Sequence, residues 1–243
     1  MDDANWIEAD WSVPAGIHAG TTLRSGGLSQ GSFDSFNLAA HVGDHQANVI
    51  SNRIRLAHML TLPQQPVWLN QQHGTRVINI DDLPESPVAD ASVTTKSGIV
   101  CTVLTADCLP VLLCDQQGRQ IAAVHAGWRG LLNGIIERTV AKFSSQQLVA
   151  WLGPAISQQA FAVGKEVRDA FVQHASQSDC AFIKGRAGEW YADLYLLATL
   201  RLQTVGLTDI SGGRFCTYHE QNYFYSYRRA NQTGRMASLI WKE

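Results

Sequence analysis

The chain has 243 residues, of which 45% are hydrophobic and 16% are charged, and its formal net charge is −2. This composition is typical of a soluble globular protein with much buried sheet, and the length allows a single domain over residues 1–243 with a large core. The balanced charge and the lack of a basic stripe in the sequence argue against nucleic-acid binding.

The cysteines and the first residues indicate a cellular compartment. Five cysteines without paired spacing argue against a disulfide scaffold and favour a reducing cytoplasm. The N-terminal segment is acidic and has no apolar run of signal-peptide length. No segment approaches the roughly 18 apolar residues that a membrane span needs. We therefore expect a cytoplasmic protein without a membrane partner, either a monomer or a weak homodimer.

The first third of the chain predicts strands around one helix. A short strand is expected at 16–19, followed by a loop at 21–31 that is rich in Gly, Ser and Thr. Apolar residues at helical spacing predict a helix over 48–60, and strands are expected at 66–69 and 77–80. The two strands enclose the tetrapeptide Gln-Gln-His-Gly.

The centre of the chain gives the clearest pattern. Three apolar runs predict buried strands at 99–104, 111–114 and 121–124. After the third run the apolar spacing changes from about 2 to 3.6 residues, which predicts a helix from Arg129 to Phe143. The remaining predicted elements are a strand at 148–152, a helix at 165–174, a helix capped by Asp193 and reaching Val205, and strands near 214–218, 223–227 and 236–241.

This order of elements predicts the fold class. Strands and helices are mixed, and several neighbouring strands are spaced like hairpins, which favours an α+β fold with mixed β-sheet layers flanked by helices. The sequence contains neither a Gly-x-Gly-x-x-Gly fingerprint nor a P-loop, which argues against dinucleotide or ATP machinery.

Three segments place metal-ligating side chains at turns or strand ends. Cys108 lies in Thr-Ala-Asp-Cys-Leu-Pro, His125 lies in Val-His-Ala-Gly-Trp-Arg-Gly, and His73 lies in Gln-Gln-His-Gly. Two imidazoles and one thiolate provide three ligands for zinc with the fourth position open, as in a catalytic site. Taken singly, each residue also fits a structural role. Cys216 as a fourth ligand would instead close a structural site.

Several residues are candidates for binding an anion or substrate. Arg129 falls in the first turn of a predicted helix, where the helix N-terminus and the guanidinium together favour an anion, although it also fits a surface arginine stacked on Trp128. Arg24 on the Gly-rich loop and Arg228 in an Arg-Arg pair are further candidates. Asn37 either caps a turn or binds substrate.

In this order, the three ligand motifs resemble the laccase-domain family, also called the YfiH-like or polyphenol-oxidase-like family. The resemblance covers about 16–241 and is also carried by Ser-Phe-Asn-Leu at 35–38, Trp-Leu-Gly-Pro-Ala-Ile at 151–156, Cys-Thr-Tyr at 216–218 and Phe-Tyr-Ser-Tyr-Arg-Arg at 224–229. It implies an α+β fold related to that of the cysteine-hydrolase toxins. It also implies one Zn²⁺ ion held by His73, Cys108 and His125.

The resemblance further implies a purine nucleoside phosphorylase acting on adenosine, inosine, guanosine and methylthioadenosine, with adenosine deaminase activity. Its partners would be a nucleoside and phosphate. In such a site Asp107, beside the ligand cysteine, is the candidate proton carrier or ligand-orienting group. Arg24 and Arg129 are candidates for the phosphate, and Tyr225 or Tyr227 for stacking on the base.

Two other activities stay open at this point. Cys108 as nucleophile with His125 as base would make a hydrolase, such as a peptidoglycan-editing enzyme that acts on a nucleotide-linked muropeptide with misincorporated serine. A copper polyphenol oxidase (laccase) binding Cu²⁺ is the other possibility, because two histidines and a cysteine also describe a blue-copper site. We rank it low, since Met1, Met59 and Met236 all lie far in sequence from the ligand motifs.

Overall fold

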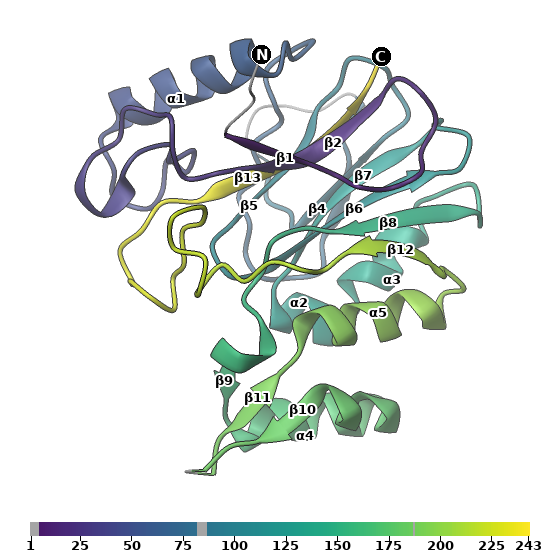
Figure 1. Cartoon of the computed structure of the whole chain (residues 1–243). Helices are drawn as coiled ribbons and strands as arrows, with labels where there is room; N and C mark the ends of the chain where they lie inside the picture. The colour runs from purple at the N-terminus through teal and green to yellow at the C-terminus, as the bar shows by residue number, and fades with distance from the viewer. Residues whose placement is uncertain (1–4, 82–86, 187) are drawn as a thin grey trace.

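The computed structural model describes residues 5–81, 87–186 and 188–243 and contains two main β-sheets with helices on both outer sides (Figure 1). The four-stranded sheet has the order β1 (Trp6–Glu8), β2 (Ile17–Thr22), β13 (Met236–Lys242), β5 (Cys101–Thr105). The six-stranded sheet has the order β12 (Asp209–Gly212), β8 (Leu148–Leu152), β6 (Leu109–Asp115), β7 (Ile121–Ala126), β4 (Ala91–Thr94), β3 (Val77–Asn79). Parallel and antiparallel pairs both occur in the second sheet, so it is mixed as predicted.

The period-2 alternation of the strands explains how the sheets stack. On β6, Val111 and Leu113 pack into the core beneath the helices, whereas Leu112 and Cys114 pack into a second core shared with the four-stranded sheet. All residues of β6 and β7 are buried, as expected for strands covered on both faces.

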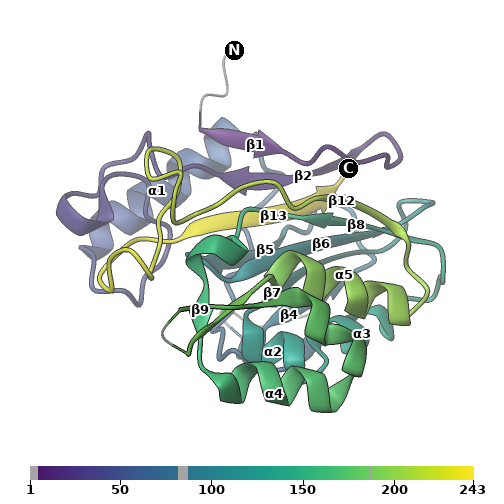
Figure 2. The ribbon, with the colours of Figure 1, turned by 60° about the horizontal axis from the view of Figure 1, so that its bottom comes forward.

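Helices close both outer faces. The helix α1 (Gln46–Met59) packs on the four-stranded sheet, where its Leu56 meets Leu239 of β13 in one core cluster. Figure 2 shows the other side, where the helices cover the six-stranded sheet: α2 (Trp128–Leu132), α3 (Ile135–Val140), α4 (Lys165–His174) and α5 (Leu194–Thr204). A small sheet of β10 (Phe182–Lys184), β11 (Trp190–Ala192) and β9 (Ala162–Val163) adjoins α4. Single 3₁₀ turns occur at Gly31–Phe33 and Gln158–Ala160, and a longer one at Ser176–Ala181.

Most predicted elements are confirmed within a few residues, including the N-cap. The Asp193 side chain accepts a hydrogen bond from the Leu196 N–H at 3.0 Å and begins α5. The single helix predicted from Arg129 to Phe143 is wrong, because the chain forms α2 and α3 instead. Gly134 between them has a φ of +91°, a left-handed conformation that interrupts a helix.

The strands predicted at 66–69, 214–218 and 223–227 are also wrong. The first two segments form only isolated bridges, at Val67 and Cys216, and the third forms turns and irregular chain. The third segment is apolar for another reason. Phe224 and Tyr225 are fully buried and anchor this loop individually in a core cluster.

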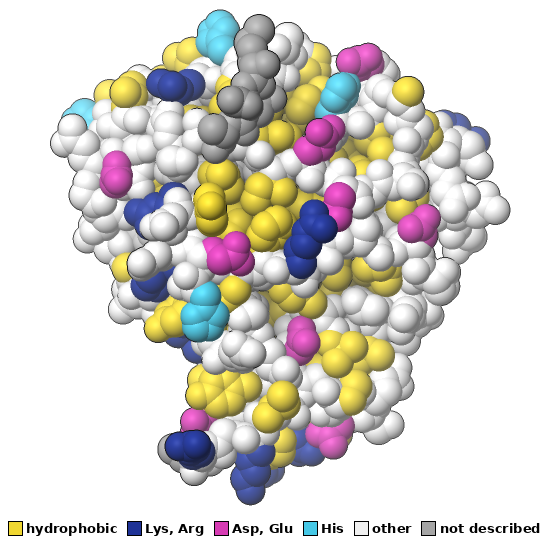
Figure 3. All heavy atoms as spheres, viewed as in Figure 1, with side chains coloured by type: hydrophobic (Ala, Val, Ile, Leu, Met, Phe, Trp, Pro, Cys, Tyr) yellow, Lys and Arg dark blue, Asp and Glu magenta, His cyan; other side chains and the backbone are white. Residues whose placement is uncertain are grey.

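Two further observations concern the length of the helices and the charge of the surface. Within the described ranges, no helix combines the length and apolarity required to cross a lipid bilayer. On the face in Figure 3, Lys and Arg side chains are scattered among Asp and Glu side chains and form no continuous stripe.

Candidate metal centre and pocket

Neighbouring strands and one loop bring the three predicted ligands together. Cys108 lies between β5 and β6, and His125 lies near the end of β7, which pairs with β6 so that Pro110 is opposite His125. His73 comes from the loop before β3 and has a φ of +56°. Gly127 leaves room for all three: a Cβ there would lie 2.9 Å from His73 Cδ2 and 3.1 Å from Cys108 Sγ.

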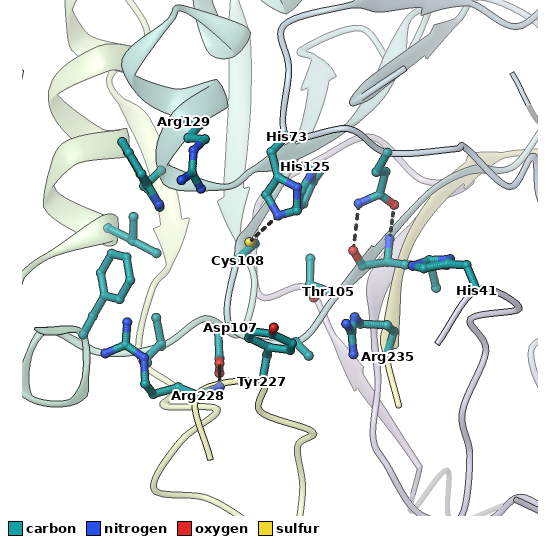
Figure 4. A pocket seen from close by; sticks show the side chains of 17 residues that line it. His41, His73, Thr105, Asp107, Cys108, His125, Arg129, Tyr227, Arg228 and Arg235 are labelled. Atoms are coloured by element: carbon teal, nitrogen blue, oxygen red, sulfur yellow. Dashed lines mark hydrogen bonds between the residues drawn. The ribbon is translucent and has the colours of Figure 1, made fainter. Parts of the chain in front are cut away.

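The geometry of the ligand atoms fits a metal ion. The ligand atoms of His73, Cys108 and His125 lie within 4.8 Å of one another. Cys108 Sγ lies 3.7 Å from His73 Nε2 (Figure 4), close to the about 3.6 Å that ordinary Zn–S and Zn–N bonds give at a tetrahedral angle. The donor set of one sulfur and two nitrogens suits zinc and also copper.

A buried carboxylate, Asp90, holds both histidines. Its Oδ1 accepts a hydrogen bond from His125 Nδ1 at 2.8 Å and one from the His73 N–H at 2.9 Å. Its Oδ2 accepts from the Gly74 N–H at 2.8 Å. Because a carboxylate only accepts, the His125 hydrogen sits on Nδ1, and Nε2 is left to bind a metal. Asp90 therefore fixes one ligand ring and the loop that carries the other.

The charges at this centre favour metal binding. Burial raises the pKa of Cys108, but the charge of His125 and hydrogen bonds from both histidines outweigh it and lower that pKa to about 6. Burial lowers the pKa of His125, but Cys108 and Asp90 outweigh it and raise that pKa to about 9. Both shifts favour a thiolate beside a protonated His125 in the metal-free centre, and a bound cation would replace that proton.

A cavity of about 570 Å³ opens onto these ligands, a volume within the usual range for small-molecule sites. Besides the three ligands, the predicted residues Asp107, Arg129, Tyr227 and Arg228 line it. Figure 4 shows Arg129 and Arg228 on one side of Cys108, and His41 and Arg235 on the other.

Asp107 lines the pocket and has a φ of +94°. Its Oδ1 accepts a hydrogen bond from Thr217 Oγ1 at 2.7 Å, and its Oδ2 accepts one from the Arg228 N–H at 2.6 Å. Both carboxylate oxygens therefore anchor the C-terminal loop that presents Tyr227 and Arg228. The predicted proton transfer by Asp107 stays a prediction beside this positioning role.

Arg24 and Asn37 are not among the residues that line the cavity. Arg24 donates hydrogen bonds to the carbonyls of Asp34 and Gln221, and its guanidinium lies 4.9 Å from the centre of the Tyr225 ring. Asn37 is fully buried and bonded entirely within the protein. Both residues shape neighbouring loops, so we give neither a direct substrate contact. Tyr225, the alternative stacking residue, is also buried outside the lining.

Sequence reasoning missed several residues of this site. Asp90 precedes a four-residue strand and Arg235 precedes the last strand. His41 lines the pocket without any local motif, and Thr105 lines it from the first position of the Cys108 motif, where no role was assigned to it. The only signal for Asp90 is its place before the short segment Ala-Ser-Val-Thr at 91–94, and many surface carboxylates stand before such segments.

Fold and site together define an α+β protein with a His-Cys-His group, able to bind a metal, in the wall of a pocket. A family model described as "Multi-copper polyphenol oxidoreductase laccase" matches residues 18–243, and the chain belongs to this family.

Relatives and solved structures match along almost the whole chain. The protein named purine nucleoside phosphorylase PA4543 from Pseudomonas aeruginosa is 48% identical, covering 97% of this chain and 98% of the relative. The Escherichia coli protein named purine nucleoside phosphorylase YfiH is also 48% identical, with the same coverage. The crystal structure of Neisseria meningitidis protein NMB0706 matches with a TM-score of 0.95 at 45% identity, covering 98% of this chain and 99% of that one.

Proposed function

We propose that this protein is a zinc-dependent purine nucleoside phosphorylase that also deaminates adenosine. The observation that carries the proposal is that one cavity of about 570 Å³ has the metal-ligating group in its wall and cationic side chains on both sides. Such a cavity has room for a nucleoside together with phosphate. The names of the relatives support the phosphorylase part of this proposal.

In phosphorolysis a phosphate oxygen forms a bond to the sugar carbon C1′ while the bond from C1′ to the base nitrogen breaks. The electron pair of the broken bond goes to the base, which takes up a proton. The residues of this chain would position both reactants, because holding them in line removes much of the barrier. A zinc ion, when bound, supplies a Lewis acid and lowers the pKa of water at its open position toward about 7.

The side chains divide this work. His73, Cys108 and His125 would hold the metal, and Asp90 keeps the His125 ring and the His73 loop in place. Two cation–aromatic pairs line one side of the pocket and offer flat surfaces for a base: Arg129 on Trp128 and Arg228 on Phe161. Tyr227 is half exposed at the lining and completes our set of substrate-contacting residues.

The test is turnover by purified protein loaded with zinc or with copper. Adenosine, inosine, guanosine and methylthioadenosine are incubated with and without phosphate, and chromatography follows free base, sugar phosphate and inosine. We expect phosphate-dependent release of base, phosphate-independent formation of inosine from adenosine, and loss of both in Cys108→Ala. Failure of the metal-replete protein to release base from any nucleoside would refute the proposal.

A second candidate uses Cys108 itself as a nucleophile, as a muropeptide-editing hydrolase would. The observation in its favour is the lowered pKa of Cys108 beside His125, where burial opposes the shift and the histidine charge outweighs it. Iodoacetamide distinguishes the two. A nucleophilic Cys108 is alkylated with or without zinc, whereas a metal-ligating Cys108 is protected once zinc is bound.

A copper oxidase is the weaker candidate, despite the description of the family model. Within the described residues, His73, Cys108 and His125 are the one group of metal-ligating side chains found, while a multicopper enzyme binds several copper ions through many more histidines.

A further inference from the structure

The pocket has a second polar side that the proposed function does not yet use. Figure 4 shows His41, Thr105 and Arg235 on the side of Cys108 away from Arg129. Strand pairing explains this position, because Met236 of β13 lies opposite Thr105 of β5. Arg235 is therefore held at the end of a buried strand beside the turn that carries Cys108.

Arg235 is a half-buried cation that forms no salt bridge to a carboxylate among the described residues. Its Nη1 donates to two backbone carbonyls, those of Thr233 at 2.8 Å and Gly234 at 2.9 Å. Burial lowers its pKa, and the negative charges of Cys108 and Asp107 offset this only in part. A guanidinium kept in such a place is stabilised by an anion, and it binds phosphate oxygens well.

Two neighbours complete the surroundings of Arg235. The Thr105 side chain lies between Cys108 and Arg235 (Figure 4), and its buried hydroxyl has no hydrogen-bond partner. Burial lowers the pKa of His41, and the positive charges of Arg235 and Arg53 lower it further. Two arginine side chains therefore lie near the His41 imidazole. This side therefore offers a guanidinium and an unpartnered hydroxyl, within reach of the negative charges of Asp107 and Cys108.

Hydrogen bonds of Asn37 connect the segment that carries Arg235 to the loop that carries His41. Asn37 Oδ1 accepts a hydrogen bond from the Arg235 N–H at 3.0 Å and another from the Ala39 N–H at 3.0 Å. Asn37 Nδ2 donates to Ala39 O and to Asp44 Oδ2. The loop that brings His41 to the pocket is thus fixed to the residue that carries the guanidinium.

We propose that Arg235, Thr105 and His41 form the subsite for inorganic phosphate, opposite the aromatic side that takes the base. This inference rests on the proposed phosphorylase function. Displacement at C1′ places the incoming oxygen and the departing base on opposite faces of the carbon. Cys108 lies between the two sides of the pocket (Figure 4), so a phosphate on one side and a base on the other would lie on opposite faces of C1′. Arg129 then belongs to the base side, and phosphate binding does not depend on it.

Two matched arginine variants test this assignment. Arg235→Gln and Arg129→Gln each remove one pocket-lining guanidinium that lies over an aromatic ring, Tyr227 and Trp128 respectively. We expect Arg235→Gln to raise the KM for phosphate about 10–100-fold, as loss of charge-assisted hydrogen bonds does, and to change the KM for nucleoside less than about 3-fold. Arg129→Gln should do the reverse.

Direct binding of inorganic phosphate, measured by ³¹P NMR line broadening without nucleoside, separates the two proposals. If wild type binds phosphate through Arg235 but turns over no nucleoside, the phosphorylase function fails while the anion subsite stands. If Arg235→Gln binds phosphate like wild type, or Arg129→Gln loses binding instead, the subsite is refuted. Should Arg235→Gln unfold, Arg235→Lys keeps the charge without the planar fork and should weaken phosphate binding by a smaller factor.

Discussion

Asp90→Asn is the sharpest perturbation of the metal centre, because it changes hydrogen-bonding capacity and charge but hardly changes volume. The carboxylate accepts from the N–H groups of His73 and Gly74 and from His125 Nδ1. An amide retains one oxygen and gains an NH₂ group. If the NH₂ faces Gly74, two donors oppose each other. If it faces His125, the ring hydrogen moves to Nε2, the atom that would bind the metal.

Either orientation weakens metal binding. Loss of a carboxylate that orients a ligating histidine lowers metal affinity about 10–100-fold, which corresponds to about 1.4–2.7 kcal/mol. Without metal, the unmatched donor costs about 1–3 kcal/mol of unfolding free energy. Burial raises the pKa of Asp90, but the hydrogen bond and charge of His125 and the backbone donors outweigh it and hold that pKa below its ordinary value. The site therefore contains a charged acceptor that the amide cannot replace.

The assay is competition between protein and a chelator of known zinc affinity, with Asp115→Asn as the control. Asp115 is also a buried carboxylate that accepts backbone N–H bonds, from Arg119 at 2.6 Å and Gln120 at 3.2 Å, but it ends β6 far from Cys108. We expect Asp115→Asn to lower stability while leaving zinc affinity within about 2-fold of wild type. Wild-type zinc affinity in Asp90→Asn would refute the reasoning.

Four further outcomes are expected. Cys108→Ala should retain little zinc after dialysis, and a full equivalent by elemental analysis would contradict its role as a ligand. In metal-free protein, alkylation of Cys108 should rise with pH around a midpoint near 6, not near the ordinary 9, when followed by mass spectrometry. Gly127→Ala should fold, because its φ of −61° suits alanine, yet lose zinc affinity because the new methyl would displace the His73 ring, 2.9 Å away, and crowd Cys108 Sγ. Tyr225→Phe removes a 2.6 Å hydrogen bond to the Phe33 carbonyl and should cost about 1–2 kcal/mol in chemical denaturation; the KM for nucleoside should not change, because Tyr225 is not among the residues that line the pocket.

The buried centre of the fold was predictable because it carries the strongest patterns. Runs such as 148–152 are apolar at every position, which buried strands require, and that strand has the predicted bounds. The short edge strands β1 and β12 are only partly buried and carry no such run. The prediction of a strand at 223–227 was wrong because this aromatic loop buries consecutive side chains, as a strand does. Its backbone forms no regular strand pairing, which the sequence pattern does not reveal.

The ligands were predictable and their supports were not, for a physical reason. Cys108 and His125 sit at ends of recognisable strands, so their approach follows from strand pairing. Asp90 meets His73 and His125 across 17 and 35 residues of sequence, and Arg235 reaches the pocket only because β13 lies beside β5. Contacts of this kind depend on the order of strands in a sheet, which local patterns do not encode.

Two carboxylates hold the backbone of the site in a conformation that it would otherwise avoid. His73 and Asp107 have φ values of +56° and +94°, and a left-handed conformation costs a non-glycine residue about 1–2 kcal/mol. Around His73, Asp90 offsets this cost by accepting the N–H groups of that turn. Around Asp107, its own side chain does so by accepting from Thr217 and Arg228. Since these bonds form within the protein alone, the ligand geometry is set before a metal or substrate arrives. Loss of Asp90 should therefore weaken metal binding and also destabilise the metal-free fold, because the same hydrogen bonds serve both.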